Sequence, residues 1–345
     1  MKNFTYYRPT TAEQAVGLLA AEWGQTELLA GGTDLLDLQK EYIAQPDKVI
    51  SLSGLGKEFA SIGEIAPPGA FPPSFTVGAG VKLAEIAGNA RIREIYPAVS
   101  SAAGLIGGPQ IRNMGTLGGN LCQRNRCWYF RDEPTVCLLK GGKKCYATDG
   151  ENRYHAIFTQ GHPCVIVSPS TVAPPLIALG ATAKVLGPKG TREVKLAEFF
   201  RAPKAPDERE HVLAPNEVVL SVTFGGASDQ FLKVQNASYE VRHKQSYDWP
   251  LVQAAVAYES PKDGGRPKNV RIVLGHVAPT PVIAAEAAKV VEGQDVTEDI
   301  ATKAGQLAAK GAKPLSQNAY KVKLVEVAVK RALLTAAGAK KYWEV

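Results

Sequence analysis

Apolar residues recur every three or four positions from residue 12 to residue 23, which predicts a helix with one buried face. Short apolar runs at 27–30 and 48–52 have the length and composition of buried strands. Residues 34–40, between the two runs, are predicted to form a short helix. The first fifty residues therefore predict a β-α-β unit.

The middle of the chain loses this regularity. Residues 64–75 carry four prolines, which predicts a surface loop. Gly104–Leu121 is rich in glycine, and its second half follows neither a helical nor a strand pattern. Residues 122–163 are rich in Arg, Lys, Cys and Gly and show little periodicity. An irregular stretch of that length inside a compact domain is usually functional or an insertion.

Regular patterns return in the last third of the chain. Residues 252–258 and 270–277 have the apolar composition of strands around a polar loop. Three helices are predicted after them, over 281–292, 297–312 and 318–337. A chain of 345 residues with strands and helices mixed in this way predicts an α+β protein of two or three domains.

Composition excludes several classes of function. An apolar content of 45% and a charged content of 21% are ordinary for a globular protein, which excludes disorder. No apolar run approaches the length of a transmembrane helix. The net charge of +7 is dispersed, without the basic stripe that nucleic-acid binding requires. The first residues lack the apolar region of a signal peptide, so export would require an exported partner.

The first of two glycine loops is Leu-Ala-Gly-Gly-Thr-Asp over residues 29–34, between a predicted strand and a predicted helix. Consecutive glycines let backbone N–H groups converge on a ligand, and the start of a helix favours a phosphate. The loop matches neither G-x-G-x-x-G nor a P-loop. On this pattern alone, a tight turn without a ligand explains the loop as well.

The second glycine loop is Gly-Thr-Leu-Gly-Gly-Asn over residues 115–120. One such loop is unremarkable. Two of them in successive α/β segments suit a long ligand that carries two phosphates. A dinucleotide of the flavin or nicotinamide type fits that description.

All five cysteines lie between residues 122 and 164, which excludes a disulfide framework spread over the chain. Their spacing contains no C-x-x-C pair, which argues against a zinc ribbon or a thioredoxin-like motif. Three interpretations remain: unrelated reduced thiols, a structural zinc site, or an iron–sulfur cluster held by four thiolates. The cationic residues and glycines around the cysteines suit an anionic cluster.

Both glycine loops resemble those of the FAD-binding subunits of molybdenum hydroxylases, a family that includes xanthine dehydrogenase, carbon monoxide dehydrogenase and aldehyde oxidoreductases. The likeness rests first on residues 29–34 and on Asn-Met-Gly-Thr-Leu-Gly-Gly-Asn-Leu-Cys over 113–122. Further similar segments extend it over essentially the whole chain: 173–181, 187–190, 198–200, 274–281 and 330–333.

About forty residues intervene here between two segments that most such subunits join almost directly. The insertion, 122–164, resembles the iron–sulfur branch of the family, and Cys-Trp-Tyr-Phe-Arg-Asp over 127–132 is similar to its aldehyde oxidoreductase members. The resemblance implies a [4Fe–4S] cluster on Cys127, Cys137, Cys145 and Cys164. Cys122 is not counted among the ligands, because family members without the insertion also carry a cysteine there. The main alternative ligand set has Cys122 in place of Cys164.

The resemblance also implies the fold. We expect a two-part FAD-binding domain of the vanillyl-alcohol-oxidase type over 1–224, divided near residue 55, and a flavoprotein C-terminal domain over 225–345. FAD would be held by two sets of residues, Leu29, Ala30, Gly31, Gly32, Thr33, Asp34 and Leu35, and Thr116, Leu117, Gly118, Gly119 and Asn120. No catalytic residue is expected on this chain.

The implied function is electron transfer within an aldehyde oxidoreductase. A large molybdopterin subunit and a small [2Fe–2S] subunit would deliver electrons to FAD here, and an external acceptor would take them. A flavin subunit of a hydroxybenzoyl-CoA reductase or a xanthine dehydrogenase is the alternative, and a zinc-stapled scaffold without redox chemistry is a different class. The expected compartment is the cytoplasm, or the periplasm through a partner. The substrate and the electron acceptor stay open.

This chain departs from the family pattern at two positions that concern the flavin. Thr171 stands where the family often has an aspartate, and Glu240 stands where it has a lysine.

Overall fold

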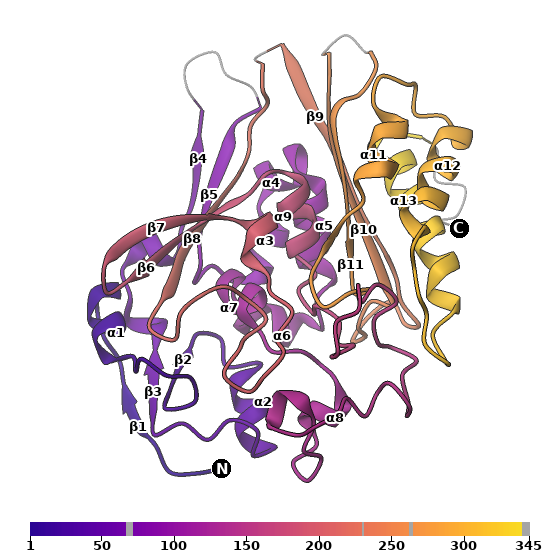
Figure 1. Ribbon diagram of the computed structural model, residues 1–345. Helices are drawn as coiled ribbons and strands as arrows, with labels where there is room; N and C mark the ends of the chain where they lie inside the picture. The colour runs from indigo at the N-terminus through magenta and orange to yellow at the C-terminus, as the bar shows by residue number, and fades with distance from the viewer. Residues whose placement is uncertain (67–71, 230, 262–264, 340–345) are drawn as a thin grey trace.

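The computed structural model describes residues 1–66, 72–229, 231–261 and 265–339, and its N-terminal part is a small parallel sheet (Figure 1). The sheet has the order β1-β3-β2, from Thr5–Tyr7, Lys48–Ser51 and Thr26–Leu29. Helices α1 (Ala12–Leu18) and α2 (Leu35–Lys40) connect its strands. The β-α-β prediction is therefore confirmed, although α1 ends five residues before Trp23 because Leu19 is extended.

A five-stranded antiparallel sheet forms the second part of the molecule. Its order is β4-β5-β8-β6-β7, from Ile62–Ile65, Ser74–Gly78, Val218–Gly225, Thr182–Gly187 and Gly190–Lys195. The loop predicted over 64–75 is thus partly strand at both ends, while residues 67–71 lie outside the described residues. Two short 3₁₀ helices, Leu52–Gly54 and Lys57–Ala60, join the small sheet to this one.

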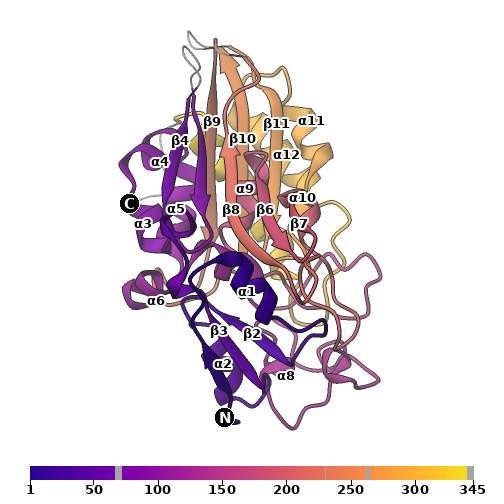
Figure 2. The same ribbon diagram turned by 90° about the vertical axis from the view of Figure 1, so that its left-hand side faces the viewer.

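A four-stranded antiparallel sheet forms the third part, in the order β12-β11-β10-β9. Its strands are Val282–Ile283, Lys268–Gly275, Val252–Pro261 and Leu232–Val241. Three helices pack on its outer face, α11 (Ala285–Val291), α12 (Glu298–Ala309) and α13 (Tyr320–Ala336), close to the three predicted ones. Figure 2 shows the two large sheets standing side by side above the small parallel sheet.

Four helices fill the space between the large sheets: α3 (Leu83–Gly88), α4 (Ala90–Ile95), α5 (Pro97–Leu105) and α9 (Ala173–Ala178). Strand β10 is buried over nearly its whole length because both of its faces are covered. Side chains alternate across a strand, so Ala255 and Ala257 face these helices while Ala254, Val256 and Tyr258 face α11–α13. No helix in the described part of the chain is long and apolar enough to cross a membrane.

Short helices replace the irregular stretch predicted within Gly104–Leu121. They are α6 (Pro109–Met114) and α7 (Leu117–Cys122). Pro109 occupies the first turn of α6, where its missing N–H would have no partner, and Thr116 caps α7. Glycine weakens helix propensity, so packing rather than local preference stabilises α7.

The cysteine-rich segment 122–164 contains little regular structure, as predicted: α8 (Trp128–Arg131) and a 3₁₀ turn at Leu138–Lys140. The remaining short helix, α10 (Leu196–Phe199), follows β7. Asn318, just before α13, and Lys321, in its first turn, anchor the far end of the segment. Asn318 Nδ2 donates to the carbonyls of residues 152, 155 and 156, and the fully buried Lys321 Nζ donates to those of Tyr154, His155 and His276.

Candidate functional site

The first glycine loop leaves the carboxyl end of β2 and enters α2. Gly32 has φ +73°, a left-handed conformation that glycine adopts without strain. Gly31 approaches the second glycine segment so closely that a Cβ on it would lie 2.0 Å from the carbonyl oxygen of Met114. The two loops are therefore in backbone contact, although more than eighty positions separate them in the sequence.

The second loop surrounds the start of α7. The hydroxyl of Thr116 accepts a hydrogen bond from the N–H of Gly119 at 3.1 Å. Gly118 lies against Ala79 at the end of β5, where a Cβ would come within 2.9 Å of the alanine Cβ. Asn120 is buried, and its Oδ1 accepts from the Ser170 hydroxyl at 2.7 Å. These contacts set the loop rigidly between the small and the five-stranded sheets.

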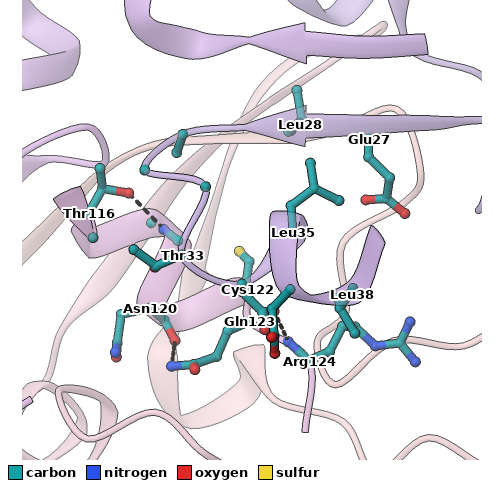
Figure 3. Close-up of a pocket in the computed structure, with 18 of the residues that line it drawn as sticks. Glu27, Leu28, Thr33, Leu35, Leu38, Thr116, Asn120, Cys122, Gln123 and Arg124 are labelled. Carbon is teal, nitrogen blue, oxygen red and sulfur yellow. Dashed lines mark hydrogen bonds between the residues drawn. The ribbon is translucent and has the colours of Figure 1, made fainter. Parts of the chain in front are cut away.

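A cavity of about 560 Å³ lies between the two loops. Figure 3 shows Thr33 and Leu35 from the first segment beside Thr116 and Asn120 from the second. Most of the predicted cofactor residues line the cavity: Ala30, Gly31, Gly32, Thr33, Asp34, Leu35, Thr116, Gly118, Gly119 and Asn120. Leu29 and Leu117 do not line it. Leu117 points into the apolar core because the helical turn directs it away from the cavity.

An ion-pair network joins the first glycine loop to the start of the cysteine segment. Asp34 accepts from the backbone N–H of Arg124 at 2.9 Å, and its other oxygen pairs with Arg131 at 2.6 Å and Arg126 at 3.0 Å. Arg131 also pairs with the half-exposed Asp37. Asp34 therefore lines the cavity and holds the segment that leads to the cysteines.

Replacing Asp34 by asparagine is expected to lower the free energy of unfolding by about 2 kcal/mol, because charge-assisted hydrogen bonds to a mostly buried carboxylate are lost. Asp37→Asn is the matched control: its carboxylate pairs with the same arginines but is 50% exposed, so a loss below about 1 kcal/mol is expected. Denaturant unfolding of both variants measures the difference. Equal losses would show that Asp34 has no special role.

The cavity also has lining residues that the sequence did not reveal. Arg126 lies 4.8 Å from the ring centroid of Trp249, and both side chains line the cavity. Arg124 pairs at 2.8 Å with the buried Glu210, which also accepts two hydrogen bonds from Asn125. Burial alone would raise the pKa of Glu210, but Arg124 and Asn125 outweigh it and the pKa lies below its usual value. No local motif marks these residues, since each contact joins distant parts of the chain.

The four predicted ligand cysteines lie in one region beside α2. Cys127, Cys137 and Cys164 belong to a small apolar cluster with Leu38 and Phe130. Cys164 donates a hydrogen bond to Cys145, which lowers the pKa of Cys145 to about 5 despite burial, with help from backbone N–H groups. Burial raises the pKa of Cys127 to about 12. Over the described ranges, however, no three His, Cys, Asp or Glu side chains form a group arranged to hold a metal ion.

Cys122 lies apart from these four. It packs against the core between the large sheets and borders the cavity. Burial alone raises its pKa to about 12, and no other cysteine contributes to that shift. The division of the five thiols into four and one is therefore visible in their surroundings.

The family comparisons cover both parts of the chain. Residues 2–224 match the model of the FAD-binding domain in molybdopterin dehydrogenase, and residues 237–336 match the C-terminal domain of the CO dehydrogenase flavoprotein. The chain is 31% identical to the aldehyde oxidoreductase FAD-binding subunit PaoB of Escherichia coli K12, over 94% of this chain and 96% of that one. It is 26% identical to the carbon monoxide dehydrogenase medium chain of Hydrogenophaga pseudoflava, over 81% and 76% of the two chains.

Solved structures agree with these relatives. Carbon monoxide dehydrogenase from Hydrogenophaga pseudoflava, in a form that lacks the Mo-pyranopterin moiety, superposes with a TM-score of 0.72 at 25% identity, over 97% of each chain. Quinoline 2-oxidoreductase from Pseudomonas putida 86 has the same fold, with a TM-score of 0.73 at 22% identity over 98% of this chain and 99% of that one.

Proposed function

Because the chain belongs to the FAD-binding subunits of the molybdenum hydroxylases, and is therefore an oxidoreductase subunit with FAD as cofactor, we propose that it is the electron-transfer subunit of an aldehyde oxidoreductase. The observation that carries the proposal is the cavity between two glycine loops in backbone contact. The α+β fold in two matched parts agrees with the expected fold class. The likeness to an aldehyde oxidoreductase subunit over nearly the whole chain favours an aldehyde as the substrate class of the complex.

FAD would bind between the two loops. The residues present suit it: Gly31 and Gly32 lack side chains, so the backbone of the first loop can approach the pyrophosphate at the start of α2. Gly118 and Gly119 leave room on the opposite wall, where their own N–H groups are bonded to the Ala79 carbonyl and the Thr116 hydroxyl. Arg126 on the cavity wall pairs with Asp34 and still has a buried Nε without a hydrogen-bond partner among the described residues, which a ligand could use. When bound, FAD supplies the ability to accept and pass on electrons singly or in pairs. The protein contributes position, shielding from water and electrostatics.

A [4Fe–4S] cluster on Cys127, Cys137, Cys145 and Cys164 is the second part of the proposal. Its support is geometric: Cys127, Cys137 and Cys164 share one apolar cluster, Cys145 lies beside Cys164, and Cys122 packs elsewhere. The side chains as they stand do not form a metal site, so binding would require them to converge. The thiols that would converge lie in loops, while Arg131 and the apolar cluster hold the middle of the segment against α2.

The partners follow from the function. A large molybdenum-cofactor subunit would oxidise the substrate, a small [2Fe–2S] subunit would pass electrons to FAD, and an external acceptor would receive them. A flavin subunit of hydroxybenzoyl-CoA reductase or xanthine dehydrogenase type is the second candidate. Sequence identity favours the aldehyde enzyme: the chain is 31% identical to the aldehyde oxidoreductase subunit PaoB and 24% identical to the xanthine dehydrogenase subunit from Escherichia coli O157:H7.

Purification of the complex from cells that express all its subunits tests the proposal. We expect a flavin band at about 450 nm, a broad iron–sulfur absorption and about four irons per copy of this chain beyond those of its partner. Aldehyde, rather than a purine or an aromatic acyl-CoA, should bleach the flavin band. A colourless chain that contains zinc would overturn the redox assignment.

A further inference from the structure

A buried carboxyl group with only one weak hydrogen-bond donor among the described residues stands behind the wall of the cavity. Glu240, on β9, has a side chain that is 2% exposed. Its Oε2 has no hydrogen-bond partner among the described residues, and its nearest cation, Arg242 Nε, is 3.8 Å away. Its Oε1 is 3.5 Å from Gln253 Nε2, at the limit of a hydrogen bond. A carboxylate in this position would be poorly stabilised.

Gln253 occupies the position directly across from Glu240 in the β9–β10 pair. Its Nε2 donates to the carbonyl of Thr171 at 2.8 Å and to the Ser238 hydroxyl at 3.0 Å. Its Oε1 is buried and has no partner in the described part of the chain. Glu240 Oε2 and Gln253 Oε1 are thus both buried hydrogen-bond acceptors without a donor among the described residues. A protonated Glu240 would supply one.

Gln253 and Arg242, which both face Glu240, each contact a residue that lines the cavity. Thr171, which receives the Gln253 hydrogen bond, lines the cavity. Leu105, whose carbonyl accepts from Arg242 at 2.9 Å, lines it as well. A charge on Glu240 would therefore act on a ligand in the cavity through a layer of mostly buried residues, where electrostatic interactions are stronger than in water.

Two other ionisable groups surround this layer. Arg242 is the cation that faces Glu240, and its guanidinium is already engaged by Leu105. His276 contacts the Thr171 hydroxyl at 3.3 Å, and burial, with Lys321, lowers its pKa to about 3, so it is neutral. Burial raises the pKa of Glu240 to about 8, because Arg242 offsets only part of the penalty. Among the described residues, Arg242 is the one compensating charge, and it is too weak to hold Glu240 ionised at neutral pH.

We propose that Glu240 is a proton-holding residue of the flavin site: its carboxyl takes its proton from solvent and shares it with the unpartnered Oε1 of Gln253, and the fraction that is ionised takes up a proton from solvent when negative charge arrives in the cavity. The inference rests on the proposed binding of FAD. If bound FAD gained two electrons and one proton, the cavity would gain one negative charge, and a Glu240 carboxylate that takes one proton from solvent would offset that charge without a further electron. The residue tunes the cofactor through the wall and does not touch it.

The test compares wild type with Glu240→Gln and with Glu259→Gln as a matched control. Glu259 is also buried in β10, but its carboxylate accepts hydrogen bonds from Ser228 and Asn269, and these lower its pKa against the effect of burial. The flavin midpoint potential is measured by spectroelectrochemistry across the pKa of Glu240 in the intact complex. Wild type and the control should show one additional proton per two electrons over part of that range, and Glu240→Gln should not.

Infrared titration of the full chain gives a readout that is independent of the cofactor. A carbonyl band of a protonated carboxyl should disappear as the pH rises through about 8 and should be missing from Glu240→Gln. Because the pKa in the folded chain lies above the ordinary 4.5, stability should fall as the pH rises from 4.5 through about 8, and this fall should be smaller in the variant.

The inference would be overturned if the flavin midpoint potential had the same pH dependence in wild type and Glu240→Gln, or if both proteins showed the same infrared band. A complex without FAD would overturn the proposed function and the coupling together. In that case the infrared band still decides whether Glu240 carries the proton.

Discussion

Gly31→Ala is expected to weaken FAD binding by on the order of a hundredfold, which corresponds to about 2.7 kcal/mol. The new Cβ would lie 2.0 Å from the Met114 carbonyl oxygen and 2.6 Å from its carbon. Both atoms belong to the backbone, so no flexible side chain can move aside. The loops must separate, and the N–H groups that face the cavity would lose their alignment.

Gly17→Ala is the control for this variant. Gly17 lies in α1, where a Cβ would meet no atom within 4 Å, so alanine should stabilise the helix by about 0.5–1 kcal/mol and leave FAD binding unchanged. Equilibrium titration of the FAD-free proteins with FAD measures both affinities. Equal affinities would mean that the two glycine loops do not enclose the cofactor.

Cys137→Ser is expected to remove nearly all of the iron of this chain, because a cubane cluster needs four thiolates and a serine hydroxyl is a poor replacement. FAD should remain bound, since Cys137 does not line the cavity. Iron analysis and electron paramagnetic resonance of the reduced protein measure the cluster, and the absorbance of released flavin measures FAD.

Cys122→Ser is the matched substitution, with the same chemistry outside the proposed ligand set. It should retain the iron and change only the packing beside the cavity. If Cys122→Ser loses the cluster while Cys164→Ser keeps it, the ligand set must include Cys122 in place of Cys164. Full iron in Cys137→Ser would exclude the cluster proposal altogether.

Local sequence patterns predicted the parts of the fold that depend on local chemistry. The β-α-β unit, the three C-terminal helices and the irregular cysteine segment each have a composition or a period that few other structures share. The glycine loops were also identifiable, because consecutive glycines before a helix have a specific use. Their convergence around one cavity agrees with the expectation that both serve a single ligand.

Features that arise from contacts between distant segments could not be predicted. Helices α6 and α7 have weak intrinsic propensity and are stabilised by packing. Arg126 and Trp249 are far apart in the sequence and meet only in the folded chain. Leu117 was predicted to contact the cofactor because it lies in the glycine motif, yet a helical turn points it into the core.

The hydrogen bonds from Asn318 and from Lys321 in α13 to residues 152–156 also determine an order of events during synthesis. Asn318 and its carbonyl partner in Asn152 are 166 residues apart, so the ribosome releases all five cysteines long before it makes the helix that anchors them. Until then, the far end of the cysteine segment lacks its partner. The cluster proposed above would therefore meet a fully anchored segment only after the polypeptide is complete.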